Sequence, residues 1–270
     1  MSKIKNAFNH GKAAVTFLTC GDPTLDVTAE AIRAAAANGA DLIELGIPFS
    51  DPTAEGPVIQ EASLRALKNG VTTDRVFDFV RDLRADVTIP MVFVTYANVV
   101  YSYGAERFLS ACHDIGIDGL ILPDLPYEEK DEFLPLCHQY DVDLISTITL
   151  TSAGRIPMIA KEAEGFLYVL ANGGGTRTEE ETYEALSRTM QTIRETTALP
   201  CAIDYDFGAV RHAGRLAGCA DGVIIADELV KLLAEQGSAA VGAIGDYVHT
   251  LKEEITSDAP YVKLRNLADS

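Results

Sequence analysis

The feature that most constrains the fold is a regular alternation between short apolar runs and helical patterns along the whole chain. The apolar runs lie at residues 14–19, 42–46, 90–96, 119–122, 144–148, 166–170, 201–203 and 222–225. Between them, apolar residues recur at three- and four-residue spacing, which is the pattern of amphipathic helices. The clearest helical patterns are 27–37, 75–83, 105–115, 130–140, 182–196 and 228–234. The chain therefore consists of repeated strand–helix units.

This alternation predicts an α/β fold with a parallel sheet. Short and almost wholly apolar strands are typical of parallel sheets that are buried on both faces. Repetition at roughly 30 residues per unit indicates a closed (β/α)₈ barrel, the TIM barrel, rather than an open doubly wound sheet. With no linker-like tract in the sequence, we expect a single domain over residues 1–270. We further expect an N-terminal helix at 1–10, a closing helix at about 238–257 and a frayed tail at 261–270.

Composition narrows the class of protein. The net charge of -18 disfavours nucleic acids and anionic membranes as partners. The five cysteines are scattered without a CxxC pair, which is typical of a reducing compartment. No signal peptide and no apolar run long enough for a membrane span are evident, so we expect a cytoplasmic protein. No metal-ligand spacing and no Ser-His-Asp arrangement is evident either, which predicts neither a metal site nor a catalytic histidine.

The most informative stretch is DLIELGIPFSDPTAEGPVIQ at 41–60. Glu44 lies in the middle of an apolar run, where ionising an acid is costly, so it is either paired or kept for chemistry. Glu55 lies on the loop that follows, where it is either a second functional acid or a solvated loop residue. Because barrel enzymes carry their chemistry at the carboxyl ends of the strands, these two acids form a candidate general acid/base pair.

Other residues at these strand ends have alternative interpretations. Tyr96 and Tyr168 follow or end apolar runs and could contact a planar ligand, although core tyrosines also occur there. For Phe17, a position in the core is favoured over a position in a functional site. The glycine-rich loop at 172–177 is typical either of a phosphate-binding loop or of a flexible lid.

The sequence also resembles a known family. IELGIPFSDPTAEGPVIQEAS closely resembles the signature of the tryptophan synthase alpha subunit family, in which a strand glutamate precedes a PFSDPxADGP loop. Further similar segments are TCGDPT at 19–24, TYANVVYSYGAERF at 95–108, ILPDLPYEE at 121–129, EGFLYVL at 164–170 and ADGVIIADELVK at 220–231. The resemblance extends over almost the whole chain and implies the same barrel.

The resemblance implies a lyase that cleaves indole-3-glycerol phosphate to indole and glyceraldehyde 3-phosphate by a retro-aldol reaction, in tryptophan biosynthesis. It implies that Glu44 shuttles protons and that the loop acid steadies charge on the indole nitrogen. Phe17, Tyr96 and Tyr168 match aromatic positions of the indole pocket. No cofactor is implied on this chain. Pyridoxal phosphate is expected only on a partner beta subunit, in a heterotetramer, and Ser50, Asp51 and Pro52 match the loop that faces that partner.

Two departures from the family pattern bear on function. The loop acid is Glu55 where the family has aspartate. The expected phosphate site carries Thr176, Arg177, Asp206 and Asp227 where the family has glycines and a glycine-serine pair. Carboxylates there would repel a phosphate, and Arg177 would offset part of this repulsion. The alternative hypothesis is therefore a divergent paralogue that binds another ligand, or acts as a non-catalytic partner of a beta-type subunit.

Overall fold

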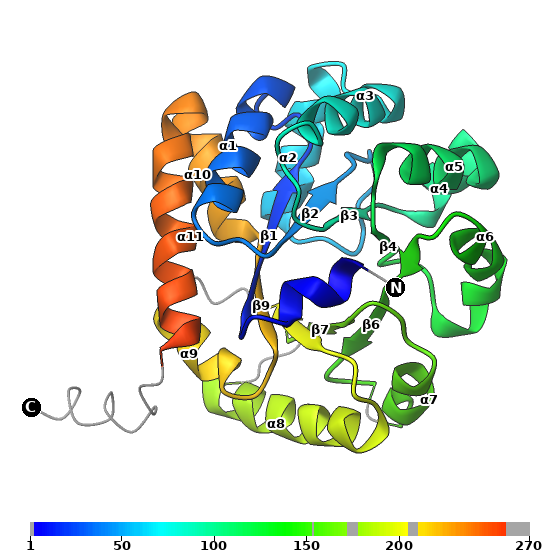
Figure 1. The fold of residues 1–270 in the computed structure, drawn as a ribbon, viewed down its shortest axis with the longest axis vertical. Helices are drawn as coiled ribbons and strands as arrows, with labels where there is room; N and C mark the ends of the chain where they lie inside the picture. Colours follow the sequence, from blue (N-terminus) through cyan, green and yellow to red (C-terminus); the bar gives the residue numbers. More distant parts are fainter. Residues whose placement is uncertain (1–2, 153, 172–177, 205–209, 258–270) are drawn as a thin grey trace, which may run out of the picture.

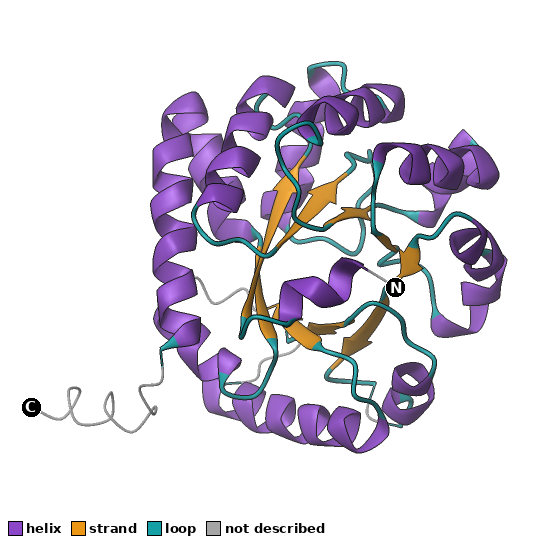
Figure 2. Cartoon of the chain, viewed as in Figure 1, coloured by secondary structure: helices purple, strands orange, loops and turns teal. Residues whose placement is uncertain are grey.

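Across the residues that the structure describes, nine parallel strands form one sheet that curls into a barrel (Figures 1 and 2). The structure is a computed structural model, and it describes residues 3–152, 154–171, 178–204 and 210–257. The strands are β1 Ala13–Thr19, β2 Leu42–Gly46, β3 Met91–Val94, β4 Gly119–Ile121, β5 Asp143–Leu144, β6 Ser146–Thr149, β7 Leu167–Leu170, β8 Cys201–Asp204 and β9 Gly222–Ile225. Their order is β5-β4-β3-β2-β1-β9-β8-β7-β6. The predicted TIM barrel is confirmed.

The strands at the two ends of this order, β5 and β6, are consecutive in the chain. β5 and β6 are separated only by Ile145, whose N–H donates to the Leu120 carbonyl at 2.9 Å. β5 pairs with β4, and β6 pairs with β7, so the chain itself joins the two edges. The single strand expected at 144–148 is therefore two short strands.

Helices surround the ring of strands (Figure 2). They are α1 Leu25–Ala37, α2 Pro57–Lys68, α3 Thr73–Leu83, α4 Ala97–Tyr103, α5 Ala105–Ile115, α6 Leu134–Gln139, α7 Ile156–Lys161, α8 Glu179–Thr196, α9 Val210–Ala217, α10 Asp227–Gln236 and α11 Ala240–Thr256. Three short 3₁₀ helices are η1 Lys3–Phe8, η2 Tyr127–Glu132 and η3 Gly237–Ala239. No helix in the described ranges is both long and apolar enough to cross a bilayer.

Alternation along each strand divides the buried side chains into two clusters. Val15 and Leu42 belong to a cluster that also holds residues of η1, and it fills the inside of the barrel. Ala14 and Ile43, one position along, belong to the larger cluster between strands and helices. Because Glu44 lies two residues after Leu42, it shares the inward face.

The N-terminal segment closes one end of the barrel. In Figure 1, η1 lies across the opening of the ring of strands. Ile4 is fully buried, and Ala7 is almost so, both within the inward cluster. A Cβ on Gly119 would come within 2.8 Å of Ile4 Cδ1, so glycine is needed there for the helix to sit against β4. The helix expected at 1–10 is therefore observed as η1, and residues 1–2 lie outside the described ranges.

The closing helix is also present. α11 packs against α1 and α9, and it follows η3 (Figure 1). Lys252 on α11 pairs with Asp41 at 2.6 Å and donates to the Lys12 carbonyl at 2.7 Å. Asp41 in turn accepts the Ala14 N–H at 2.7 Å, so these contacts fix α11 to the starts of β1 and β2. The tail expected at 261–270 lies outside the described residues.

Candidate active site

Glu44 is a fully buried acid on the inner wall of the barrel. In the sheet it lies beside Phe17 of β1 and Val92 of β3. Within the part of the chain that the structure describes, neither carboxylate oxygen of Glu44 has a hydrogen-bond partner. The pKa of Glu44 is raised well above its ordinary value, mainly because burial removes the hydration of the charged form. Repulsion from Asp204 and, to a smaller extent, from Glu55 raises the pKa further. Glu44 is therefore a buried acid without a hydrogen-bond partner among the described residues, and its raised pKa favours the protonated form.

Asp204 is a second inward-facing acid. It ends β8, two residues after Ala202 of the inward cluster, and accepts a hydrogen bond from the Tyr168 hydroxyl at 2.6 Å. Burial, then the charges of Asp204 and Glu44, raise the pKa of Tyr168, so the phenol keeps its proton. Sequence reasoning assigned no role to Asp204, because the residue was interpreted as the start of the turn after the strand. The signal that identifies it is its spacing from Ala202.

Backbone groups of the loop after β2 form hydrogen bonds with the side chains of Tyr96 and Gln60. The Ala54 N–H donates to the Tyr96 hydroxyl oxygen at 2.9 Å, and the Phe49 and Tyr96 ring centroids lie 5.1 Å apart. Gln60 on α2 donates from Nε2 to the Glu55 carbonyl at 2.9 Å. Glu55 is half-buried and acts electrostatically on both Glu44 and Tyr168. The structure thus brings the two acids predicted from the sequence to one site.

Tyr96 has a structural role in that arrangement. Burial, then the charge of Glu55, raise the pKa of its hydroxyl, so the group remains neutral. Tyr96 and Phe17 are buried, whereas Tyr168 is only partly buried. All three predicted aromatic residues therefore lie around the acids, from β1, the start of α4 and β7.

The predicted partner-facing residues differ in exposure. Ser50 and Asp51 are exposed, and the Ser50 hydroxyl donates to Asp51 Oδ2 at 2.6 Å. Pro52 is buried within this chain, and its carbonyl accepts the Glu55 N–H at 3.1 Å. The side chains of Ser50 and Asp51 are therefore accessible from solvent, while Pro52 is packed within this chain.

Only one of the four residues predicted at the phosphate end can be placed. Asp227 opens α10, just after β9, and pairs with Lys231 one turn later at 3.5 Å. The Asp227 side chain is only 16% exposed, and the positive charge of Lys231 partly offsets its negative charge. Thr176, Arg177 and Asp206 lie outside the described residues.

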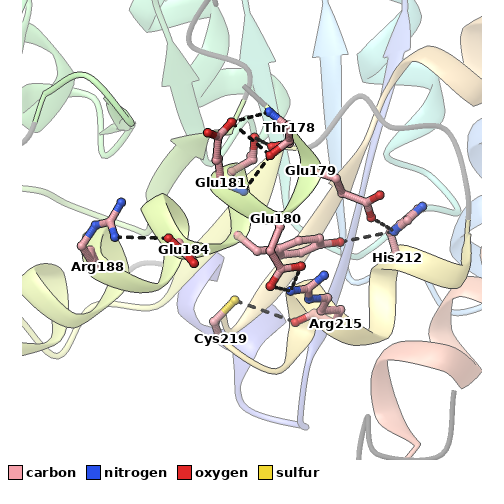
Figure 3. Close-up of polar contacts among 11 residues, drawn as sticks. Thr178, Glu179, Glu180, Glu181, Glu184, Arg188, His212, Arg215 and Cys219 are labelled. Atoms are coloured by element: carbon pink, nitrogen blue, oxygen red, sulfur yellow. Dashed lines mark hydrogen bonds and ion pairs between the residues drawn. The ribbon is translucent and has the colours of Figure 1, made fainter. Parts of the chain in front are cut away.

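The first turn of α8 is joined to α9 by ion pairs (Figure 3). Thr178 and Glu181 form a capping box that begins α8. Glu179 pairs with His212 on α9 at 2.8 Å, and Glu180 pairs with Arg215 at 2.9 Å. These contacts fix the first turn of α8 against α9, next to the carboxyl ends of β7 and β8.

A recess of about 420 Å³ is lined by both apolar and polar side chains, and neither Glu44 nor Glu55 is among its lining residues. Its lining includes Ile145, which belongs to the inward cluster, together with Leu122 and Leu170. This volume is within the range of small-molecule pockets. Across the described ranges, no group of three or more His, Cys, Asp or Glu side chains could hold a metal ion.

Comparison with known proteins identifies a family. The model of the tryptophan synthase alpha chain family matches residues 3–256. The chain is 42% identical to the tryptophan synthase alpha chain of Lacticaseibacillus casei over 252 residues, covering 93% of this chain and 95% of that one. It is 39% identical to that of Lactiplantibacillus plantarum, covering 94% and 97%. Tryptophan synthase subunit alpha of Legionella pneumophila superposes with a TM-score of 0.85 at 30% identity, covering 94% and 98%.

Proposed function

This chain belongs to the tryptophan synthase alpha chain family and is a lyase of that type, and on this premise we propose a reaction and roles for its residues. The proposed reaction is the retro-aldol cleavage of indole-3-glycerol phosphate to indole and glyceraldehyde 3-phosphate. The observation that carries the proposal is Glu44, a buried acid with no hydrogen-bond partner in the described structure. Similarity over nine-tenths of the chain does not favour the alternative of a non-catalytic paralogue.

Glu44 acts first as a general acid. Because burial and neighbouring acids raise its pKa, Glu44 carries a proton when substrate arrives. Transfer of that proton to C3 of the indole ring leaves a positive charge on the ring nitrogen. With C3 protonated, the indole ring can leave as a neutral molecule when the bond from C3 to the glycerol carbon breaks.

Glu44 acts next as a general base. Its carboxylate takes the proton from the hydroxyl on the glycerol carbon bonded to C3. The oxygen electrons form the aldehyde, the carbon–carbon bond breaks, and its electron pair returns to the indole ring. Glu44 ends the cycle protonated, so no cofactor is required for proton balance on this chain.

Glu55 steadies the positive charge on the indole nitrogen during these steps. The support for this role is its position on the loop fixed by Tyr96 and Gln60, from which its charge already reaches Glu44. Fixed charges aimed at a developing charge are among the largest contributors to catalysis. Phe17, Tyr96 and Tyr168 supply the aromatic surface around the indole.

The phosphate of the substrate lies at the carboxyl ends of β7, β8 and β9 in this proposal. Thr176, Arg177, Asp206 and Asp227 are the side chains assigned to that end. The Asp227 carboxylate would repel a phosphate, and its pairing with Lys231 reduces that repulsion.

A beta-type subunit that carries pyridoxal phosphate is the proposed partner, in a heterotetramer. Ser50 and Asp51 are exposed on the loop that also holds Glu55, so a partner that contacts them would act on the site through this loop. The beta subunit would receive the indole.

The test is indole release by the purified chain, with and without a tryptophan synthase beta subunit. We expect turnover of indole-3-glycerol phosphate with this chain alone and faster turnover with the partner. Indole-3-glycerol, which lacks the phosphate, is the matched control and should turn over poorly. Absence of turnover under both conditions would refute the proposal, and equal turnover of the two substrates would refute the phosphate assignment.

A further inference from the structure

Asp204 lies three strands away from Glu44 around the barrel and acts on it electrostatically. β1 and β9 lie between β2, which carries Glu44, and β8, which carries Asp204. Both acids lie on inward faces, because Leu42 and Ala202, two residues before them, belong to the inward cluster. Among the charged residues that act on Glu44, Asp204 has the largest effect and Glu55 the next.

Tyr168 on β7 hydrogen-bonds Asp204 and interacts with Glu44 only electrostatically. Its hydroxyl lies in the same interior as Glu44 and donates to Asp204 Oδ2 at 2.6 Å. A phenol has one proton to donate, so the proton given to Asp204 is not available to Glu44. A donor to a carboxylate would favour the charged form of that carboxylate. Asp204 therefore withholds a donor from Glu44 and also adds a negative charge that acts on it.

We infer that Asp204 is a positioning residue of the proposed reaction: it binds the Tyr168 hydroxyl and so leaves the Glu44 carboxyl group without a hydrogen-bond donor until substrate binds. The inference rests on the proposed function, since it assumes that Glu44 starts the cycle as an acid. Asp204 acts through Glu44 and Tyr168 and needs no contact with substrate. Among the described residues, Asp204 on β8, Glu55 on the loop after β2 and Tyr168 on β7 are the titratable groups that act with Glu44.

Three substitutions separate charge from hydrogen bonding. Asp204→Asn removes the charge and leaves an oxygen that can accept from Tyr168. Asp204→Ser removes the charge with a smaller side chain, in case the first variant fails to fold. Tyr168→Phe removes the donor and leaves the charge. Asp246→Asn, at an exposed position on α11, is the matched control for loss of one acid.

Activity gives the first readout. An essential acid makes kcat/KM fall as pH rises through its pKa. We expect Asp204→Asn to move this falling limb to lower pH, with about a tenfold loss of kcat/KM at its alkaline end and little loss at its acidic end. Tyr168→Phe should leave the limb in place or move it to higher pH. A limb at the same pH in wild type and Asp204→Asn, or a loss that is equal at every pH, would overturn the inference.

Infrared spectroscopy gives a readout that is independent of turnover. A protonated carboxylic acid has a C=O band that a carboxylate lacks, and Glu44→Gln identifies the band of Glu44. That band should disappear at lower pH in Asp204→Asn than in wild type or Asp246→Asn. If the protein shows no lyase activity but the band still shifts, the proposed function fails while the effect of Asp204 on Glu44 holds. If activity is normal and the band does not shift, the inference alone fails.

Discussion

Phe17 lies directly against Gly46, with no room for a side chain between them. In the β1–β2 register Phe17 is paired with Glu44, and Gly46 lies two residues further along β2. A Cβ on Gly46 would come within 2.6 Å of Phe17 Cζ. Real Cβ contacts essentially never occur at that distance, so any larger residue at 46 must displace the ring. Gly46 therefore sets the position of an aromatic side chain beside Glu44.

Gly46→Ala should lower both kcat/KM and stability. Displacing Phe17 in a packed barrel costs about 1–3 kcal/mol of unfolding free energy, and a misplaced ring near the reacting atoms costs about 100-fold in rate. Steady-state kinetics and urea unfolding of the same variant check both. Gly56→Ala is the matched control, because a Cβ there meets nothing within 4 Å. Equal activity of the two variants would contradict the role assigned to Phe17.

Glu55 should tolerate aspartate but not glutamine. Glu55→Gln removes the charge that steadies the indole nitrogen, and we expect kcat to fall about 100-fold. Glu55→Asp keeps the charge on the fixed loop, and we expect it to retain most activity. Single-turnover rates of the three proteins measure this directly. If the glutamine variant is as fast as wild type, Glu55 is only a loop residue.

Asp227 and Lys231 should affect substrate affinity in opposite directions. Asp227→Asn removes a like charge from the proposed phosphate end and should lower KM about fivefold, since one such pair in water is worth about 1 kcal/mol. Lys231→Ala removes the counter-ion and should raise KM. KM for the analogue without phosphate should change in neither variant. The assignment is wrong if both substitutions change the two substrates alike.

Replacing Glu44 should stabilise the fold at high pH while removing activity. The folded protein keeps a proton on Glu44 that the unfolded chain releases above the ordinary pKa of 4.5. The stability that this proton contributes is fully present below that pH and is lost as pH rises through the raised pKa, by about 1.4 kcal/mol per pH unit. Urea unfolding across pH should show wild type losing stability relative to Glu44→Gln. Glu30→Gln, at an exposed position on α1, should follow wild type, and parallel curves for all three would contradict the buried, protonated Glu44.

Much of this fold could be predicted from the sequence, because strands in a closed barrel are buried on both faces. The apolar runs at 42–46 and 222–225 coincide with β2 and β9. Helices were expected between the strands, but no residue ranges were predicted for α2, α4, α7 and α9. α2 begins at Pro57 directly after a glycine turn, so its start was interpreted as part of the loop.

The site could be predicted only where a residue breaks a pattern. Glu44 is an acid in an apolar strand, and this contrast alone identified it. Asp204 also ends an apolar strand, but the acids that follow it in the sequence made it look like part of a polar turn. Its contact with Tyr168 depends on the register between β7 and β8, which the strand pattern alone does not specify.

The most direct test of the account is the release of glyceraldehyde 3-phosphate from indole-3-glycerol phosphate by wild type and by Glu44→Gln. Glutamine preserves the size of the side chain and removes its transferable proton, and Glu30→Gln controls for the loss of one acid. General acid–base catalysis is worth about 100- to 10,000-fold, and here one residue serves both steps. The account predicts that Glu44→Gln is at least about 1,000-fold slower, with a folded barrel by circular dichroism. A Glu44→Gln variant that retains more than about a tenth of wild-type activity would contradict it.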